Sequence, residues 1–329
     1  MTLLRNKKIA SLCLLVLLTF PVLTIANPND QIVTYHIHNS NLANQLFDQI
    51  NAKNIWDNLN YFSSFPDRYA ESENGIKAEE WIIQQIETMI TDSHRTDVSI
   101  SIIPTMTPYF SLKQSSIVVK IGNQLLEPGI VLGAHIDTYP ITDGLNKPGA
   151  DDDGTGTVTL IEVFRSILAS KLTFNKPIYF VWYAAEEMGL LGSQSVVDDF
   201  QKKKIPVEAV LNVDMTGFIY QNDQTIWLVR NDLNSDLNNF MEELINTYLH
   251  KPVAYTSCGY DCGDQVSWEK QGYKAVFPTE GKLGEDMHIN PFKHTPQDTV
   301  DSLSIDRMTD FAKLAMAFSI ELAEPKSNE

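Results

Sequence analysis

The sequence predicts an α/β fold, a three-layer α/β/α sandwich with a mostly parallel mixed central sheet. Helical patterns and strand candidates interleave through the central part of the chain, as in folds whose parallel strands are joined by helices. Apolar strand candidates such as IYFVWYA and AVLNV show no clean polar alternation. That pattern is expected when helices cover both faces of a sheet.

The elements follow in order along the chain. Helical patterns are expected around residues 42–59 and 75–90, the second with Ser72 and Asn74 at its head. Strands are expected at 98–103, 117–121 and 129–134, and Gly154 and Gly156 then open an apolar helix. Later strands are expected at 177–184, 209–214 and 225–229, and later helices at 193–203, 233–249, 264–272 and 305–323.

The N-terminus has the composition of an export signal. Basic residues precede the apolar run 9–25, and small residues offer a cleavage site before Asn27. An uncleaved membrane anchor is the alternative, because the run approaches spanning length. We expect a signal peptide at 1–26, a polar lead-in or short pro-segment at 27–40 and a single domain at 41–329. The protein would then be secreted or periplasmic, without membrane contact after signal cleavage.

Charge and cysteine content further limit the classes of protein to which this chain can belong. The 329 residues include 25 basic and 42 acidic side chains, a formal net charge of −17. Nucleic-acid binding requires a basic face, so we expect no nucleic-acid partner. After signal cleavage Cys258 and Cys262 remain, and in an oxidising compartment we expect them to form a disulfide. A Cys-x3-Cys metal pair is the alternative.

A cluster of acids and a histidine surrounds the central strand. His135 and Asp137 stand at the end of the strand at 129–134, and a loop leads from there to Asp151, Asp152 and Asp153. Three adjacent carboxylates repel one another unless hydrogen-bond donors or cations neutralise them. Surface acid clusters are usually just solvated. The apolar strand before and the apolar helix after this cluster favour a metal site.

Further candidate ligands follow the next two strands. Glu186 and Glu187 come after the strand at 177–184, and Asp214 ends the strand at 209–214. In sheets of this kind the chemistry gathers at the carboxyl ends of the strands, and unpaired charge there is costly. His294 lies in a loop ahead of the last helix and, taken alone, is a type of residue more often found at the surface.

The order and the residues of six motifs resemble those of the M28 zinc aminopeptidases, especially the secreted bacterial leucyl aminopeptidases. These motifs are GAHID, PGADDDGTG, YAAEEMGLLGS, NVDMTG, CGYDCGD and KHTPQDT. The resemblance covers nearly the whole mature chain and implies the zinc-exopeptidase type of α/β/α fold. It also implies a secreted metallo-aminopeptidase that hydrolyses the N-terminal bond of peptides with a free amine, and we expect a monomer.

The resemblance further implies two Zn²⁺ per chain. One would be held by His135, Asp152 and Asp214, and the other by Asp152, Glu187 and His294, with Asp152 bridging. Zinc accepts imidazole nitrogen and carboxylate oxygen, and catalytic sites keep a position open for water.

Two acids have expected roles beside the ligands. By the same resemblance, Glu186 would be the general base for a hydroxide that bridges the two ions. Asp137 lies on the same side of an extended chain as His135 and would accept the second N–H of that ring. The resemblance also implies a cis peptide bond at Asp152–Asp153.

Substrate choice follows from positions that match the apolar pocket of the family. These are Met215, Cys258, Tyr260, Cys262, Phe277 and Leu283, and they favour a Leu-, Phe- or Met-like first residue. Each is equally explained as ordinary core. Lys293 stands where an apolar residue is usual, and the segment 281–290 looks expanded and acidic. We expect the ammonium of Lys293 to point to solvent; if it reached the pocket, it would favour Glu or Asp.

Three alternatives remain at this point. A dipeptidase or carboxypeptidase of related fold needs cations to grip a free carboxylate, and Arg165 and Arg230 are isolated in the sequence. A glutaminyl cyclase binds a single metal, whereas the candidate ligand set here is complete. A non-catalytic binding relative is disfavoured because Glu186 is retained beside that set.

Overall fold

The computed structural model describes residues 34–141, 143–230 and 235–326. The predicted signal peptide at 1–26 lies outside the described residues, as does the first half, 27–33, of the predicted lead-in at 27–40. The described residues from Tyr35 onward form one compact unit. Within the described ranges, no helix has both the length and the apolar character needed to cross a lipid bilayer.

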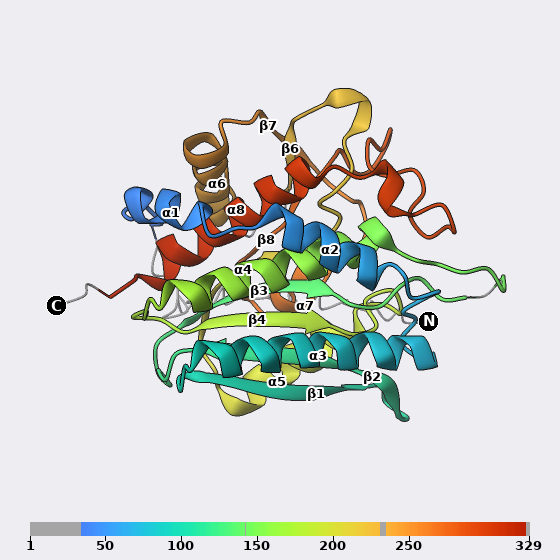
Figure 1. Cartoon of the computed structure of the whole chain (residues 1–329), viewed down its shortest axis with the longest axis horizontal. Coiled ribbons are helices and arrows are strands. Elements are labelled where there is room, and N and C mark those ends of the chain that lie inside the picture. The colour runs from blue at the N-terminus through green and yellow to red at the C-terminus, as the bar shows by residue number, and fades with distance from the viewer. Residues whose placement is uncertain (1–33, 142, 231–234, 327–329) are drawn as a thin grey trace, which may run out of the picture. The chain divides into compact units, whose positions relative to one another are not determined.

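The main sheet has six strands in the order β1-β2-β4-β3-β5-β8 (Figure 1). Strands β4, β3, β5 and β8 are parallel neighbours, and β1 and β2 add antiparallel pairings at one edge. All residues of β3 and β4 are buried, which explains why these strands lack polar alternation. The mixed, mostly parallel sheet is confirmed. Its strands are β1 (Val98–Met106), β2 (Ser111–Ile121), β3 (Gly129–His135), β4 (Ile178–Tyr183), β5 (Val207–Asn212) and β8 (Ala275–Val276).

Helices cover both faces of this sheet, as the sequence predicts. The ring of Phe180 on β4 packs against Phe164 of α4 on one face, with α3 and α8 beside it. Tyr179 on the same strand packs against Phe200 of α5 on the other face, next to α7. The helices are α1 (Ser40–Phe47), α2 (Ala52–Phe62), α3 (Glu73–Ser93), α4 (Gly156–Ser170), α5 (Leu191–Lys203), α6 (Ser235–Leu244), α7 (Gln265–Glu269) and α8 (Ile305–Ala323).

A second, smaller sheet was not predicted. The strand expected at 225–229 is β6 (Ile226–Val229), and it pairs with β7 (Val253–Thr256) and β9 (Pro278–Thr279) rather than with the main sheet. Strands this short are stabilised by their neighbours and leave no periodic pattern in the sequence.

The helix expected at 42–59 is two helices, α1 and α2. The side chain of Asn51 caps α2 by accepting the backbone N–H of Lys53 at 2.9 Å. Glu162 on α4 in turn accepts the backbone N–H of Asn51 at 2.7 Å. A contact with a distant helix therefore fixes the break, and the helical periodicity of the segment could not indicate it.

Candidate metal centre

Three strand ends bring candidate ligands to one edge of the main sheet. His135 is the last residue of β3, Asp214 follows β5, and β4 ends at Tyr183, just before Glu186 and Glu187. Because β3 lies between β4 and β5 in parallel register, the carboxyl ends of all three strands meet. The end of β4 before Glu186 also frees the two glutamates from strand alternation, so their side chains can serve different purposes.

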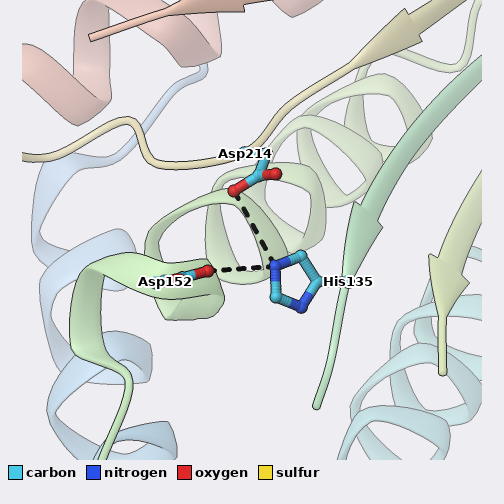
Figure 2. A group of neighbouring side chains, drawn as sticks. All are labelled: His135, Asp152 and Asp214. Atoms are coloured by element: carbon cyan, nitrogen blue, oxygen red, sulfur yellow. Dashed lines mark hydrogen bonds and ion pairs between the residues drawn. The ribbon is translucent and has the colours of Figure 1, made fainter. Parts of the chain in front are cut away.

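His135, Asp152 and Asp214 form one group of donors (Figure 2). One donor atom of each lies within 4.8 Å of the others, and all three residues are buried. The Nε2 atom of His135 lies 3.1 Å from Asp152 Oδ1 and 3.8 Å from Asp214 Oδ1. In Figure 2 the side chains come from three separate segments and point toward one another. The buried Oδ1 atom of Asp214 has no hydrogen-bond partner among the described residues, so it is available to a cation.

A second group of donors shares the middle aspartate. Its members are Asp152, Glu187 and His294. The Nε2 atom of His294 lies 3.0 Å from Asp152 Oδ2 and 3.0 Å from Glu187 Oε1. Asp152 thus turns one carboxylate oxygen to each group, which is the geometry that a bridging ligand requires.

Hydrogen bonds leave only the middle carboxylate of the triplet facing both groups. Asp153 accepts the backbone N–H of His135 at 3.1 Å, and its peptide bond with Asp152 is cis, as the resemblance implied. The carboxylate of Asp298 accepts the backbone N–H groups of Asp151 at 3.0 Å and Asp152 at 3.1 Å. Backbone donors thus engage the outer carboxylates, from His135 to Asp153 and from Gly217 to Asp151, and Asp298 holds the backbone of Asp152 from behind.

Asp137 connects the ends of β3 and β4. Its carboxylate accepts the backbone N–H groups of Glu186 at 2.9 Å and Glu187 at 3.2 Å. The Nδ1 atom of His135 lies 3.1 Å from the backbone carbonyl of Asp137 and 3.4 Å from its carboxylate. The second nitrogen of the ring therefore faces Asp137, with the backbone oxygen nearer than the carboxylate oxygen.

The carboxylates of this region are crowded in a buried environment. Burial raises the pKa of Glu186 well above its usual range, that of Glu187 to about 7 and that of Asp214 to about 6. Burial also acts on Asp152, but hydrogen bonds from His135 and His294 hold the pKa of Asp152 well below its usual range. Ionising all of these acids at once costs free energy unless a positive charge lies beside them, which fits a site that binds cations.

A cavity of about 270 Å³ opens next to these groups. Its wall includes five of the six predicted pocket residues, Met215, Tyr260, Cys262, Phe277 and Leu283, but not Cys258. Met215, Phe277 and Leu283 are buried together, whereas Tyr260 is 64% exposed. The predicted disulfide between Cys258 and Cys262 is present, and its sulfur-bearing side chains pack against the buried three.

Lys293 lines this cavity, so the expectation that its ammonium points to solvent is wrong. Burial lowers the pKa of Lys293, but the nearby charges of Asp152, Asp214 and Glu187 outweigh burial and raise it overall. The ammonium therefore lies within electrostatic reach of the metal-ligand candidates.

Sequence reasoning missed the residues that brace the site. The ring of Tyr139 stacks on His294 with centroids 4.3 Å apart. The buried guanidinium of Arg68 donates to the carbonyls of Ile136 at 2.9 Å and Gly149 at 2.8 Å, on either side of the loop that leads to the aspartate triplet. All of these contacts come from irregular segments, where no periodicity marks a contact.

Comparisons with known proteins identify the family of the chain. The family model described as peptidase family M28 matches residues 116–319. A leucine aminopeptidase 1 of Coccidioides posadasii is 35% identical over 297 residues, which cover 87% of this chain and 74% of that protein. The crystal structure of the Legionella pneumophila LapA aminopeptidase superposes with a TM-score of 0.83 at 42% identity, covering 88% of this chain and 77% of that one. LapB from the same organism gives 0.82 at 40% identity, with coverages of 88% and 77%.

Proposed function

Because the chain belongs to peptidase family M28 and is a metallo-aminopeptidase, we propose that it uses two zinc ions to remove a Leu-like first residue from peptides with a free amine. The observation that carries the proposal is the pair of donor groups that share Asp152 beside an apolar cavity. We also propose that it acts as a monomer without a nucleic-acid partner.

The residues present fit zinc. Each donor group offers one imidazole nitrogen and two carboxylates, the ligand types that catalytic zinc takes. His135 and Asp214 would hold one ion, Glu187 and His294 would hold the other, and Asp152 would touch both. When bound, zinc supplies Lewis acidity, which polarises a substrate carbonyl and makes water easier to deprotonate.

Glu186 would be the general base of the reaction. It lines the cavity but belongs to neither donor group, so its carboxylate is free to move a proton. Burial raises its pKa, which suits a group that must accept a proton near neutral pH. Glu186 would take a proton from the attacking water and then deliver it to the nitrogen of the leaving amine. Asp137 would hold the backbone of Glu186 in place during both transfers.

The cavity wall supports the preference for an apolar first residue. Met215, Phe277 and Leu283 present buried apolar surface next to the donor groups, and a Leu side chain of the substrate would gain by covering it. The disulfide between Cys258 and Cys262 would keep this wall rigid. The carboxylate of Glu186, which lines the cavity but belongs to neither donor group, would favour a substrate whose α-amine is free and positively charged.

The test compares three substrates with the zinc-loaded protein. We expect hydrolysis of Leu-p-nitroanilide and no hydrolysis of N-acetyl-Leu-p-nitroanilide, because acetylation removes the charge of the amine. The third substrate, N-acetyl-Leu-Leu, has only a free carboxylate, and we expect it to stay intact. Cleavage of this peptide without cleavage of the anilide would establish a carboxypeptidase instead.

Export is a separate part of the proposal. The predicted signal peptide at 1–26 supports it, by composition alone. N-terminal sequencing of the protein recovered outside the cytoplasm should then read from Asn27. A chain that retains its first residues there would contradict signal cleavage.

A further inference from the structure

Lys293 places a cation in a cavity whose neighbouring walls are apolar. It is half-buried, and it lines the same cavity as Met215, Phe277 and Leu283. Its backbone N–H donates to the carbonyl of Asn290 at 3.4 Å, which fixes the start of the side chain. Across the residues that the structure describes, no carboxylate lies within 4.0 Å of its ammonium in an ion pair.

The other lysine of this cavity is already neutralised. Lys270 forms an ion pair with Asp261 at 2.5 Å, and its side chain is 56% exposed. Water and a carboxylate therefore stabilise the charge of Lys270. Lys293 is less exposed to water, and its ammonium has no ion-pair partner among the described residues. A partly buried charge without a partner costs free energy. A ligand with an opposite charge would therefore bind favourably next to Lys293.

The acids of the site do not supply that partner. The carboxylates that act on Lys293 are Asp152, Asp214 and Glu187, and all three belong to the proposed zinc-binding groups. A carboxylate that binds a metal ion offers little of its charge to a lysine nearby. The partner of Lys293 is therefore expected among the molecules that enter the cavity.

We propose that Lys293 is a specificity-determining residue that accepts an acidic first residue of the substrate and rejects a basic one. This inference rests on the proposed aminopeptidase function. A glutamate side chain has an apolar stem that can lie along Met215 and Phe277, and a terminal carboxylate that can meet the ammonium. A lysine or arginine side chain in the same place would bring two cations together. The enzyme would thus cleave Glu-initiated peptides besides Leu-initiated ones.

Substrates that differ in charge but not in shape test this proposal. We would measure kcat/KM with the p-nitroanilides of Leu, Glu, Gln and Lys, using the zinc-loaded protein. Glu and Gln have nearly the same shape, so their ratio isolates the effect of charge. Lys293→Met keeps the unbranched stem and removes the ammonium. Lys270→Met removes a cation from the same cavity whose charge is already paired, and it serves as the matched control.

In Lys293→Met, the Glu-to-Gln ratio should fall by at least about tenfold, and the Lys-to-Gln ratio should rise by a similar factor. Lys270→Met should leave both ratios near those of the unmodified enzyme. Equal ratios in the unmodified enzyme and Lys293→Met would overturn the proposal while leaving the aminopeptidase function intact. Preference of the unmodified enzyme for Lys over Gln would overturn it as well.

A binding measurement separates this inference from the proposed function. Calorimetric titration with free L-glutamate, L-glutamine and L-lysine reports on the cavity whether or not the protein turns over a substrate. Glutamate should bind more tightly than glutamine to the unmodified protein, and this difference should vanish in Lys293→Met. If the unmodified protein hydrolyses no anilide but still binds glutamate more tightly than glutamine, the proposed function is refuted and the role of Lys293 stands. Identical affinities for glutamate and glutamine would refute the role of Lys293. Zinc content, measured in every variant, shows that the compared proteins carry the same metal load.

Discussion

The carboxylate of Asp137 accepts the backbone N–H of Glu186 at 2.9 Å, which ties the end of β4 to the end of β3. The same carboxylate accepts the N–H of Glu187 at 3.2 Å. One buried side chain thus sets the positions of two glutamates for which we propose different roles. This contact explains how two adjacent residues, Glu186 and Glu187, can be held in positions that suit a base and a metal ligand.

Removing this carboxylate should harm both roles. In Asp137→Ala the turn at Glu186 loses its anchor and His135 loses a neighbour of its Nδ1 atom. We expect a fall of roughly 10–100-fold in zinc affinity and a fall in kcat at saturating zinc, as for other residues that orient metal ligands. Zinc titration and steady-state kinetics measure the two effects. Asp57→Ala is the control, because that exposed acid of α2 pairs with the exposed Lys53 at the surface. Unchanged zinc affinity and kcat in Asp137→Ala would show that the anchor is dispensable.

The proposed base should be separable from the ligands. Glu186→Gln keeps the shape of the side chain but cannot accept a proton, so kcat should fall by roughly 10²–10⁴ or more. Zinc content per chain, measured by atomic spectroscopy, should stay at the level of the unmodified protein. A parallel loss of zinc would mean that Glu186 is a ligand, and its role would then have to be exchanged with that of Glu187.

The shared aspartate should be the most sensitive ligand. Asp152→Ala removes a donor from both groups, so we expect weak binding of both ions. Asp214→Ala and Glu187→Ala each remove a donor from one group, so each should weaken mainly one ion. Calorimetric zinc titration of the three variants resolves the two cases. Single-site losses of equal size in all three would rule out the bridging role.

The central sheet and its ligands could be predicted because they follow one local rule. Apolar runs mark β3, β4 and β5, and the polar residues just after them fall at one sheet edge when the strands are parallel. Glu186, Glu187 and Asp214 were recognisable on that ground alone. His294 was not, because a loop histidine carries no such pattern; only its motif resemblance singled it out.

The rest depended on contacts between distant segments. Glu162 fixes the break between α1 and α2, and Asp298 holds the backbone of the aspartate triplet from a loop near the C-terminus. The direction of Lys293 was predicted wrongly for a similar reason. A long side chain reaches either solvent or a cavity depending on the walls around it, and those walls come from Met215 and the segment around Leu283.

A buried glutamate in the first third of α3 predicts how stability depends on pH. Glu79 is 8% exposed and accepts the backbone N–H of Ser115 at 2.9 Å, and burial raises its pKa from 4.5 to about 7. Between these values the folded protein holds a proton that the unfolded chain has lost. The stabilising contribution is therefore complete below the unfolded pKa and is lost as the pH rises through the folded pKa.

Glu79→Gln removes this titration but keeps an oxygen that can accept the N–H of Ser115. Relative to the unmodified protein, its free energy of unfolding should rise by about 1–3 kcal/mol between about pH 5 and pH 8. Urea denaturation at several pH values measures the difference. Glu87→Gln, at an exposed position of α3, should show no such trend. A pH-independent difference for Glu79→Gln would contradict the burial argument.

Anomalous diffraction at the zinc absorption edge, from crystals of the zinc-loaded protein, tests the two-zinc centre most directly. The account predicts two peaks per chain, one beside His135 and Asp214 and the other beside Glu187 and His294, with the carboxylate of Asp152 in contact with both. A single peak, or two peaks of which only one touches Asp152, would contradict it.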